Sequence, residues 1–399
     1  MSRGRGRLPF DLGRLRRMNV TLLLCMVALM VVGVCFVFSA NSIRDSLHLQ
    51  SLYRAHAQMA AVGIVAVLAL AYTDYRRFAK VAWIGYLAAL ALLVAVLAMG
   101  ETRMGARRWV FGMQPSELAK VTTLLALAHL LGRPDARRDI WEFLLGGALT
   151  ALPMALVLAQ PDLGTALIFV PVLLVMLFVA GTAPRAWCTA AAAGLLAVAL
   201  VVGAIVLQES PGVAPGWRRA AARATFFLDD YQRNRLVDAL YPDRDPLNLG
   251  WNRRQSRIAV GSGGVWGKGF LKGDQNLLGY LPQQVSANDF IFSVLAEEKG
   301  YAGSLVVLLL YAGVIFATIR VAWTSRDGFG RLICTGVAAL FFCHVFINIA
   351  MTIGLLPVTG LPLPFLSYGR TFMLTAILAV GLVQSVAVHG PRQMAEIGA

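Results

Sequence analysis

The stretch NVTLLLCMVALMVVGVCFVFSA, residues 19–40, is a long apolar run that contains no charged side chain. A helix needs about 20 mainly apolar residues to cross a hydrocarbon core that is ~30 Å thick. A run of this kind after a basic tail can also be a signal peptide, but this one is long and lacks a clear small-residue cleavage site. We therefore expect residues 19–40 to be a retained first membrane span.

Further apolar runs fill most of the chain beyond the first one. Of the 399 residues, 58% are hydrophobic and only 14% are charged, whereas about a quarter of the residues in ordinary soluble domains are charged. The sequence therefore predicts an all-α integral membrane protein of about ten transmembrane helices, with one large extracytoplasmic loop between spans 7 and 8. The candidate spans lie near residues 19–40, 55–72, 81–99, 116–131, 143–160, 164–181, 188–207, 300–323, 331–355 and 371–389.

The basic residues of the short connecting segments predict the orientation. They alternate onto one side of the bundle, which carries roughly two to three times the Lys and Arg of the opposite short loops and is therefore cytoplasmic. Both termini then lie in the cytoplasm. This topology also accounts for the net charge of +15, so we expect no nucleic-acid partner. The cytoplasmic groups are the N-terminal tail, Arg76, Arg77, Lys80, Arg133, Arg137, Arg138, Arg185, Arg326, Arg331 and Arg392.

The same alternation divides the chain into five parts. Residues 1–18 form a basic cytoplasmic tail, 19–207 hold helices 1 to 7, 208–289 form the large extracytoplasmic loop, 290–389 hold helices 8 to 10, and 390–399 form a second cytoplasmic tail. Loops as long as the large one escape the charge rule, so its arginines do not contradict the assignment. Its many Trp, Phe, Leu and Tyr residues argue against disorder.

One part of the large loop has the spacing of an amphipathic helix. Two interpretations stay open, namely a basic helix that lies at the outer interface among anionic lipid headgroups, and a helix packed on the spans with its arginines in solvent. The apolar positions are Ala220, Ala224, Phe227, Leu228 and Tyr231, and the flanking cations are Arg218, Arg219, Arg223, Arg233 and Arg235.

Four polar stretches on the outer side carry the candidate site residues. The first is GARRW at 105–109, followed by QPSELAK at 114–120. Pro115 and Glu117 suit the first turn of a helix, and Lys120 is spaced to pair with Glu117 on one helix face. A helix start with a snorkelling lysine explains this second part. A helix start explains the first part of the stretch less well, where Arg107, Arg108 and Trp109 stand.

The second and third stretches have strong structural explanations. In QPDLGT, residues 160–165, Asp162 stands beside Pro and Gly, where turn chemistry is about twice as common as a functional role. The third stretch, QSRIAVGSGGVWGKG at 255–269, contains Ser262 and Lys268. Its glycines could let backbone amides approach a phosphate. The segment is nevertheless neither a P-loop nor a dinucleotide-binding fingerprint, so the motif is weak by itself.

The third stretch leads to an aspartate with a local structural explanation. SAND at 286–289 has the pattern of a capping box, so on local sequence alone Asp289 is a helix cap more often than a catalyst. A helix over residues 287–323 would be roughly 55 Å long. We therefore expect it either to project outward or to break near Gly300.

Two acidic residues follow in the same helix. Glu297 and Glu298 lie near the apolar zone, where acidic side chains are costly and are functional candidates by default. Lys299 and Lys120 are possible partners for them.

The fourth stretch is GLLPVTGLPLPFLSYGR at 354–370, which is apolar although three prolines prevent a regular helix. Non-helical backbone at membrane depth persists only where it is buried in protein or lines a cavity. We expect either the wall of a site, with Ser367 and Tyr368 in it, or a purely structural re-entrant turn.

Taken together, these stretches resemble the SEDS family (shape, elongation, division and sporulation), which includes RodA, FtsW and SpoVE. No single motif is decisive, but the matches occur in the family's order and cover nearly the whole chain. They are TDY at 73–75, GARRW at 105–109, QPSE at 114–117, PDLGT at 161–165, YQR at 231–233, GSGG at 261–264, DFIF at 289–292, EE at 297–298 and residues 360–369.

The resemblance implies a peptidoglycan glycosyltransferase, most like the RodA type, in the bacterial cytoplasmic membrane. The family polymerises lipid II into glycan strands at the outer face, typically with a class B penicillin-binding protein that cross-links them. By its DFIF context, Asp289 corresponds to the family's essential aspartate. Trp109 corresponds to a functionally important tryptophan.

The chain departs from the family pattern at several positions. The link between Trp109 and Gln114 is shorter than usual, and Arg370 takes the place of a common second glycine. The segment just before Asp289 also differs, at Gln283, Ala287 and Asn288. These differences affect the detailed alignment of the loop more than the class of protein.

The resemblance also suggests a mechanism. A hydroxyl of lipid II would attack the anomeric carbon of the growing strand, with inversion, while Asp289 accepts its proton. Arg107, Arg108, Lys120 or a divalent cation (Mg²⁺ or Mn²⁺) would neutralise the leaving undecaprenyl diphosphate. The sequence shows no Cys/His metal-ligand spacing, so we assign no metal ligands. The further substrate-binding candidates are Glu117, Asp162, Ser262, Lys268, Glu297, Glu298, Ser367 and Tyr368.

Two other classes of function stay open. A flippase for lipid-linked precursors would also use polar groups within a ten-span bundle, although only the Pro-rich segment at 357–364 interrupts a span and it has no counterpart. A non-catalytic scaffold for a penicillin-binding protein is the second alternative. The membrane lipids themselves are partners in every case.

Overall fold

The computed structural model describes most of the chain. Several residues of the sequence analysis lie outside the described residues, namely residues 1–15 of the N-terminal tail, Arg137, Arg138, Arg392, Phe227, Leu228, Tyr231, Arg235 and Gln283. The described residues are 16–42, 51–103, 106–136, 139–210, 212–225, 233–234, 236–237, 240–241, 249–281 and 286–390.

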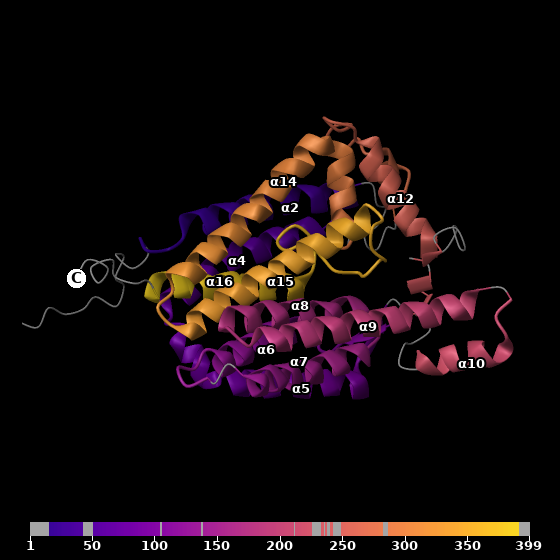
Figure 1. Cartoon of the computed structure of the whole chain (residues 1–399). Coiled ribbons are helices and arrows are strands. Elements are labelled where there is room, and N and C mark those ends of the chain that lie inside the picture. The colour runs from indigo at the N-terminus through magenta and orange to yellow at the C-terminus, as the bar shows by residue number, and fades with distance from the viewer. Residues whose placement is uncertain are drawn as a thin grey trace, which may run out of the picture.

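Among the residues that the structure describes, ten long helices form the bundle. They run roughly along one axis (Figure 1). Within the described ranges, nine of them are long and apolar enough to cross a membrane, and the remaining one, α6, has 17 residues. The predicted fold class is therefore confirmed. The ten helices are α2 (Val20–Asn41), α4 (Leu52–Tyr72), α5 (Arg76–Met99), α6 (Pro115–Leu131), α7 (Ile140–Leu158), α8 (Leu163–Ala180), α9 (Pro184–Glu209), α14 (Ile291–Thr324), α15 (Gly328–Thr352) and α16 (Arg370–His389).

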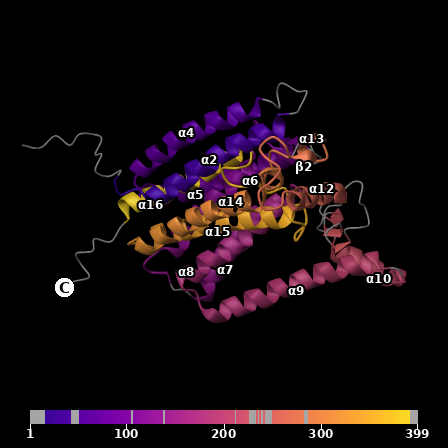
Figure 2. The ribbon, with the colours of Figure 1, turned by 90° about the horizontal axis from the view of Figure 1, so that it is seen from above.

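Short elements gather at one end of the bundle (Figures 1 and 2). A two-stranded antiparallel hairpin, which the all-α prediction did not include, joins β1 (Glu101–Arg103) to β2 (Ala106–Trp109). In the described part of the chain between α9 and α14 lie the helices α10 (Pro215–Ala224), α12 (Leu249–Ser262) and α13 (Asp274–Leu277). The long connection between the seventh and eighth long helices therefore has secondary structure of its own.

The last two helices form the centre of the bundle. In α16, 83% of the most apolar window is buried, and in α15 the share is 72%, whereas in α9 it is 12%. Figure 2 shows α9 to one side of the other helices. Because lipid can solvate an apolar side chain as well as protein can, an exposed apolar helix such as α9 is compatible with a membrane.

Helix α14 breaks at Gly300, which confirms one of the two expectations for this helix. Gly300 has φ 64° and ψ −162°, a backbone conformation that only glycine adopts readily. The N–H groups of Tyr301 and Ala302, just after the break, donate to the carbonyls of Gly264 and Val265 at 2.8 and 3.0 Å. The turn after α12 therefore holds the break in place.

The start of α14 corrects one prediction. The helix begins at Ile291 and its N-cap is Phe290, whose side chain makes no capping hydrogen bond. Asp289 precedes the N-cap, so the capping-box interpretation of residues 286–289 is wrong. The local explanation for this aspartate is thereby removed.

The amphipathic segment of the large loop is described only in part. Helix α10 carries Arg218, Arg219 and Arg223 and ends at Ala224. It packs against the end of α9, at the edge of the bundle (Figure 2). A choice between its two interpretations stays open, because most of its predicted apolar positions lie beyond the described part.

We expect Gly300→Ala to destabilise the protein by about 1–3 kcal/mol, the usual cost of a disfavoured backbone conformation. A Cβ at this position would also lie 2.6 Å from the carbonyl oxygen of Val265. Thermal unfolding in detergent measures the effect. Gly147→Ala in α7, where an added Cβ meets nothing within 4 Å, is the matched control and should not lower the midpoint. Equal midpoints for both variants would contradict the role of Gly300.

Candidate functional site

A cavity of about 490 Å³ lies where three of the four polar stretches of the sequence, the first, the second and the fourth, meet the segment around Asp289. Its size is within the usual range for ligand pockets, about 300–1,000 Å³. Residues of the β2–α6 segment, the α7–α8 turn, α12, the approach to α14 and the Pro-rich segment all line it. Its lining includes Arg108, Trp109, Gln114, Glu117, Asp162, Asn252, Asn288, Asp289, Tyr368, Arg370 and Thr371.

The hairpin β1–β2 brings Arg108 and Trp109 to the cavity. After β2 the chain reverses through Phe111 and Gly112, which both have positive φ, and the backbone groups of Val110 and Met113 bond each other at 3.0 Å in both directions. Positive φ at both central residues is the pattern of a tight two-residue turn. The short link from Trp109 to α6 is therefore a compact hairpin turn.

Arg108 ties the hairpin to the α7–α8 turn. Its guanidinium donates to the backbone carbonyls of Gln160, at 3.2 Å, and of Pro161, and it lies 3.6 Å from the Asp162 carboxylate. The same carboxylate accepts from the N–H of Thr165 at 3.2 Å and so caps α8. Asp162 is thus both turn chemistry and part of the cavity wall, so its two interpretations are compatible.

The Pro-rich segment between α15 and α16 forms a wall of the cavity, as one of its two interpretations predicted. Its backbone is held from several sides within the protein. The Tyr311 hydroxyl donates to the Pro364 carbonyl at 2.7 Å. Ser367 Oγ donates to the Asn288 carbonyl at 2.6 Å and accepts from the N–H of Leu363 at 2.8 Å.

Asp289 sits at the edge of this wall. The Asn348 side-chain amide on α15 donates to two carbonyls, that of Asp289 at 2.8 Å and that of Leu361 at 2.6 Å. A Cβ added to Gly360 would lie 3.5 Å from Asp289 Oδ2, so this carboxylate faces the Pro-rich segment across the cavity lining. Asn348 therefore fixes the backbone of Asp289 relative to that wall.

Next to the cavity, a buried network of charged and polar side chains links α6, α15 and the Pro-rich segment. The Lys120 ammonium lies 2.9 Å from Glu117 Oε1, as their spacing predicted, and 2.9 Å from Nε2 of His344 on α15. His344 Nδ1 lies 3.1 Å from the Pro362 carbonyl. Both contacts are satisfied when Nδ1 carries the imidazole proton and Nε2 accepts from Lys120. The network thus joins α6 and α15 to the Pro-rich wall.

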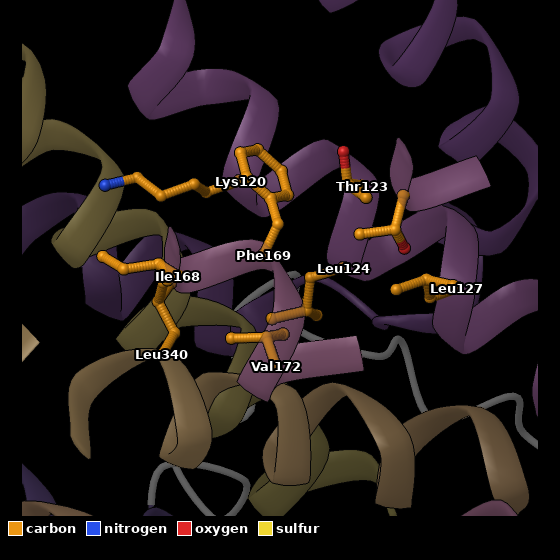
Figure 3. A pocket seen from close by; sticks show the side chains of 9 residues that line it. Lys120, Thr123, Leu124, Leu127, Ile168, Phe169, Val172 and Leu340 are labelled. Atoms are coloured by element: carbon orange, nitrogen blue, oxygen red, sulfur yellow. The ribbon is translucent and has the colours of Figure 1, made fainter. Parts of the chain in front are cut away.

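Lys120 itself does not line this cavity, which is called the outer cavity from here on because its polar stretches belong to the side predicted to be outer. It borders a separate hollow of about 10 Å³ among apolar side chains of α6, α8 and α15. Figure 3 shows its nitrogen at the side of this hollow that is farthest from Leu127. The hollow is at the lower limit for one water molecule, so it holds no substrate.

Glu297 and Glu298 lie in α14 just before its break at Gly300, and they belong to a different cluster. Glu297 accepts from the Lys268 ammonium at 2.8 Å, from the N–H of Gln275 at 3.0 Å and from Ser262 Oγ at 3.4 Å. Glu298 accepts from the N–H of Leu271 at 3.1 Å and from Ser39 Oγ. Both are buried, and they fasten the loop after α12 to α14.

Backbone amides of the glycine-rich loop donate hydrogen bonds to carbonyls of the protein itself. The N–H groups of Lys268 and Gly269 donate to the carbonyls of Glu297 and Glu298 at 3.0 Å each. A Cβ at Gly267 would collide with the Glu298 carbonyl. These contacts contradict a phosphate cradle at this loop, because the glycines allow close backbone packing instead. Burial alone would lower the pKa of Lys268, but the carboxylates of Asp274 and Glu297 raise it above its usual value.

The structure brings together about half of the predicted site residues. Arg108, Trp109, Glu117, Asp162, Asp289 and Tyr368 line the cavity. Lys120 and Ser367 support it from behind, whereas Arg107 is exposed, with its guanidinium 3.4 Å from the Leu97 carbonyl. The glycine-rich loop and the acidic pair, which hold Ser262, Lys268, Glu297 and Glu298, form the separate cluster.

Sequence reasoning missed several residues of the site. Asn348 and His344 are polar residues within the apolar helix α15, a signal that could have found them, because such residues are costly in a span. Arg370 and Thr371 begin α16 and line the cavity. Thr371 Oγ1 accepts from the N–H of Gln114 at 3.2 Å. Asn252 comes from α12, where nothing in the local sequence distinguishes it.

Comparison with known proteins gives consistent similarities. The family model described as cell cycle protein (FtsW, RodA, SpoVE) matches residues 19–391. Peptidoglycan glycosyltransferase RodA of Treponema pallidum is 33% identical over 92% of this chain and 96% of its own length. Peptidoglycan glycosyltransferase MrdB of Escherichia coli K12 is 35% identical, over 93% and 94% respectively.

A solved structure is similar over nearly the whole chain. It is described as "Structural coordination of polymerization and crosslinking by a peptidoglycan synthase complex", and the matching chain is 30% identical with a TM-score of 0.71. The match covers 95% of this chain and 98% of that one.

We expect Lys120→Met to destabilise the protein by roughly 3–5 kcal/mol, because it leaves the buried Glu117 carboxylate without its ammonium partner. The double variant Glu117→Gln/Lys120→Met removes both charges and should recover a large part of that loss. Thermal unfolding in detergent compares them, with Arg107→Met as the exposed control. Equal losses for the single and double variants would refute a coupled pair.

Proposed function

The chain belongs to the FtsW/RodA/SpoVE family of cell cycle proteins, and from that premise we propose that it is a peptidoglycan glycosyltransferase. It polymerises lipid II into glycan strands at the outer face of the bacterial cytoplasmic membrane, in cell elongation or division. The family match confirms the resemblance found in the sequence. The two relatives described above are named peptidoglycan glycosyltransferases.

The observation that carries the proposal is the convergence at the outer cavity. A half-buried carboxylate, Asp289, stands there together with the cations Arg108 and Arg370 and the ring of Trp109. A polymerase of lipid-linked sugars needs one base for the attacking hydroxyl and positive charge for the leaving diphosphate. This cavity holds both kinds of group.

Asp289 serves as the general base. The 4-hydroxyl of lipid II attacks the anomeric carbon of the growing strand, and its proton passes to the Asp289 carboxylate. The bond from that carbon to undecaprenyl diphosphate breaks, and the configuration inverts in a single displacement. Asn348 and the Pro-rich segment support this role because they fix the carboxylate's backbone.

Arg370 is the cation best placed for the leaving diphosphate. Its exposed guanidinium lines the cavity, and it forms no ion pair with any residue in the described ranges. Arg108 also lines the cavity, but its donors are partly used by the α7–α8 turn. Lys120 and Arg107, the other cations of the sequence analysis, lie outside the cavity lining.

A divalent cation does not fit a site made by these residues alone. Among the described residues, no group of three His, Cys, Asp or Glu side chains is arranged to hold a metal ion. Of the cavity carboxylates, Glu117 is paired with Lys120 and Asp162 contacts Arg108 and Gln114. These residues alone therefore do not enclose a divalent cation, which would need the substrate diphosphate among its ligands.

A class B penicillin-binding protein is the proposed partner, since the similar solved structure is that of a peptidoglycan synthase complex. The end of the bundle with α10, α12 and the outer cavity faces the periplasmic side in this proposal, and both termini lie in the cytoplasm. The charge distribution of the short loops supports this orientation.

Asp289→Asn should abolish glycan polymerisation, because the amide cannot accept the proton of the attacking hydroxyl. Purified protein with labelled lipid II and electrophoresis of the product measures the activity, and thermal unfolding checks the fold. Asp274→Asn is the matched control, since Asp274 is an exposed carboxylate of the separate loop cluster. Full polymerisation by Asp289→Asn would overturn the assignment of the base.

The same assay separates the alternative functions. Polymer formed by the isolated chain excludes a scaffold-only role, and polymer formed only with the partner synthase shows dependence on it. Transfer of lipid II across vesicles without any polymer would identify a flippase and overturn the proposed function.

We expect Arg370→Gln to lower the polymerisation rate by roughly ten- to a hundredfold, since it removes positive charge from the leaving group's side. Arg370→Lys keeps the charge and should retain part of the rate. Arg320→Gln, an exposed arginine on α14 outside the cavity lining, is the control. A normal rate for Arg370→Gln would show that another group stabilises the leaving diphosphate.

A further inference from the structure

A second large cavity opens at the other end of the bundle. Its volume is about 570 Å³. It lies between the start of α5, the end of α6 with the turn after it, the end of α8 and the start of α15. These are the opposite helix ends from those that frame the outer cavity, so in the proposed orientation this second cavity faces the cytoplasm.

The charge of its walls is strongly positive. The single carboxylate, Asp327, is fully used by neighbouring groups. Its Oδ1 caps α15 by accepting from the N–H of Gly330 at 2.8 Å, and its Oδ2 accepts from the Tyr75 hydroxyl at 2.8 Å and from Arg76 Nε at 3.2 Å. The arginines that line the cavity are Arg76, Arg133, Arg326 and Arg331.

Three of these arginines have uncompensated charge. Arg76 pairs with Asp327 and also lies 3.6 Å from Asp74. With the residues that the structure describes, the side chains of Arg133, Arg326 and Arg331 form no hydrogen bond and no ion pair. Like charges around one hollow repel each other, so their placement favours an anionic ligand between them.

Two glycines bring these arginines together. Gly132, at the end of α6, and Gly328, at the start of α15, touch backbone to backbone. A Cβ on Gly132 would lie 2.7 Å from the backbone nitrogen of Phe329, and one on Gly328 would lie 2.8 Å from the Gly132 carbonyl oxygen. Arg133 therefore meets Arg326 of the α14–α15 turn and Arg331 of the first turn of α15 at one cavity.

The floor of the cavity is apolar. Leu131 and Leu332 are buried there, and Val179 and Phe329 are half-buried beside them. Arginines whose side chains simply extend to water would not require a cavity with an apolar floor between them. A ligand that matches this cavity has an anionic head and an apolar part next to it.

We propose that this cavity binds the phosphodiester headgroup of an anionic membrane lipid, with Arg133, Arg326 and Arg331 around the phosphate and the glycerol and first acyl carbons on the apolar floor. The position supports the lipid, because the ends of membrane-spanning helices lie at headgroup level and basic pockets between them bind such headgroups. The guanidinium fork also matches phosphate oxygens in pairs. Free phosphate has the same charge but would leave the apolar floor uncovered.

Native mass spectrometry of the purified full chain in detergent tests this directly. The parent protein should retain one phosphatidylglycerol with about tenfold or greater preference over phosphatidylcholine, and added salt should weaken this preference. Arg133→Gln/Arg331→Gln should lower that affinity by about tenfold or more. The matched control is Arg77→Gln/Lys80→Gln, which removes two charges from the same face but outside the cavity, and it should bind as the parent does.

Each outcome decides the proposal. An equal loss in the cavity variant and the control would show general surface attraction and overturn the site. Inorganic phosphate that stabilises the parent, without any lipid preference, would overturn the lipid assignment. Arg133→Lys/Arg331→Lys keeps the charge and provides a folded comparison if the Gln variant is unstable. A parent protein without preference for phosphatidylglycerol refutes the proposal whatever the variants do.

Discussion

The constraint on which this structure depends is the need to pair every backbone polar group that lies at membrane depth. The segment between α15 and α16 cannot meet this need as a helix, because its prolines break it. Side chains of neighbouring helices pair its carbonyls instead, Tyr311 from α14 and Asn348 from α15. Since the segment is held inside protein in this way, it can form a rigid wall, and the outer cavity is the space in front of that wall.

The same constraint explains why charged residues inside the bundle occur in connected groups. An isolated buried charge is very costly, while a paired and hydrogen-bonded one is tolerated. Glu117, Lys120 and His344 form one group behind the cavity. Glu297 and Glu298 belong to another group, where they hold the loop after α12 against the break in α14. In both groups the charges position backbone, so intramembrane acidity by itself did not distinguish catalytic from structural residues.

Sequence alone predicts the helices well and the site only partly. Hydropathy identified the ten long helices, because an apolar run long enough to span the membrane seldom forms any other structure. Local spacing predicted the Glu117–Lys120 pair, yet it misassigned the residues before Ile291 as a cap, since the pattern of a capping box does not show where the helix starts. The contacts of Arg108 with the α7–α8 turn and of Asn348 with Asp289 join segments far apart in sequence. No local pattern contains such pairs, so only the folded chain reveals them.

The two cavities are built on the same helices. α6 carries Glu117 and Lys120 near the outer cavity and ends at the arginine-lined one, and α15 likewise runs from Asp327 and Arg331 to His344 and Asn348. The glycine contact of Gly132 with Gly328 fixes these two helices at one end, and the Lys120–His344 contact fixes them near the other. One fixed helix pair therefore frames both cavities, and Asn348 of that pair holds the Asp289 carbonyl in place.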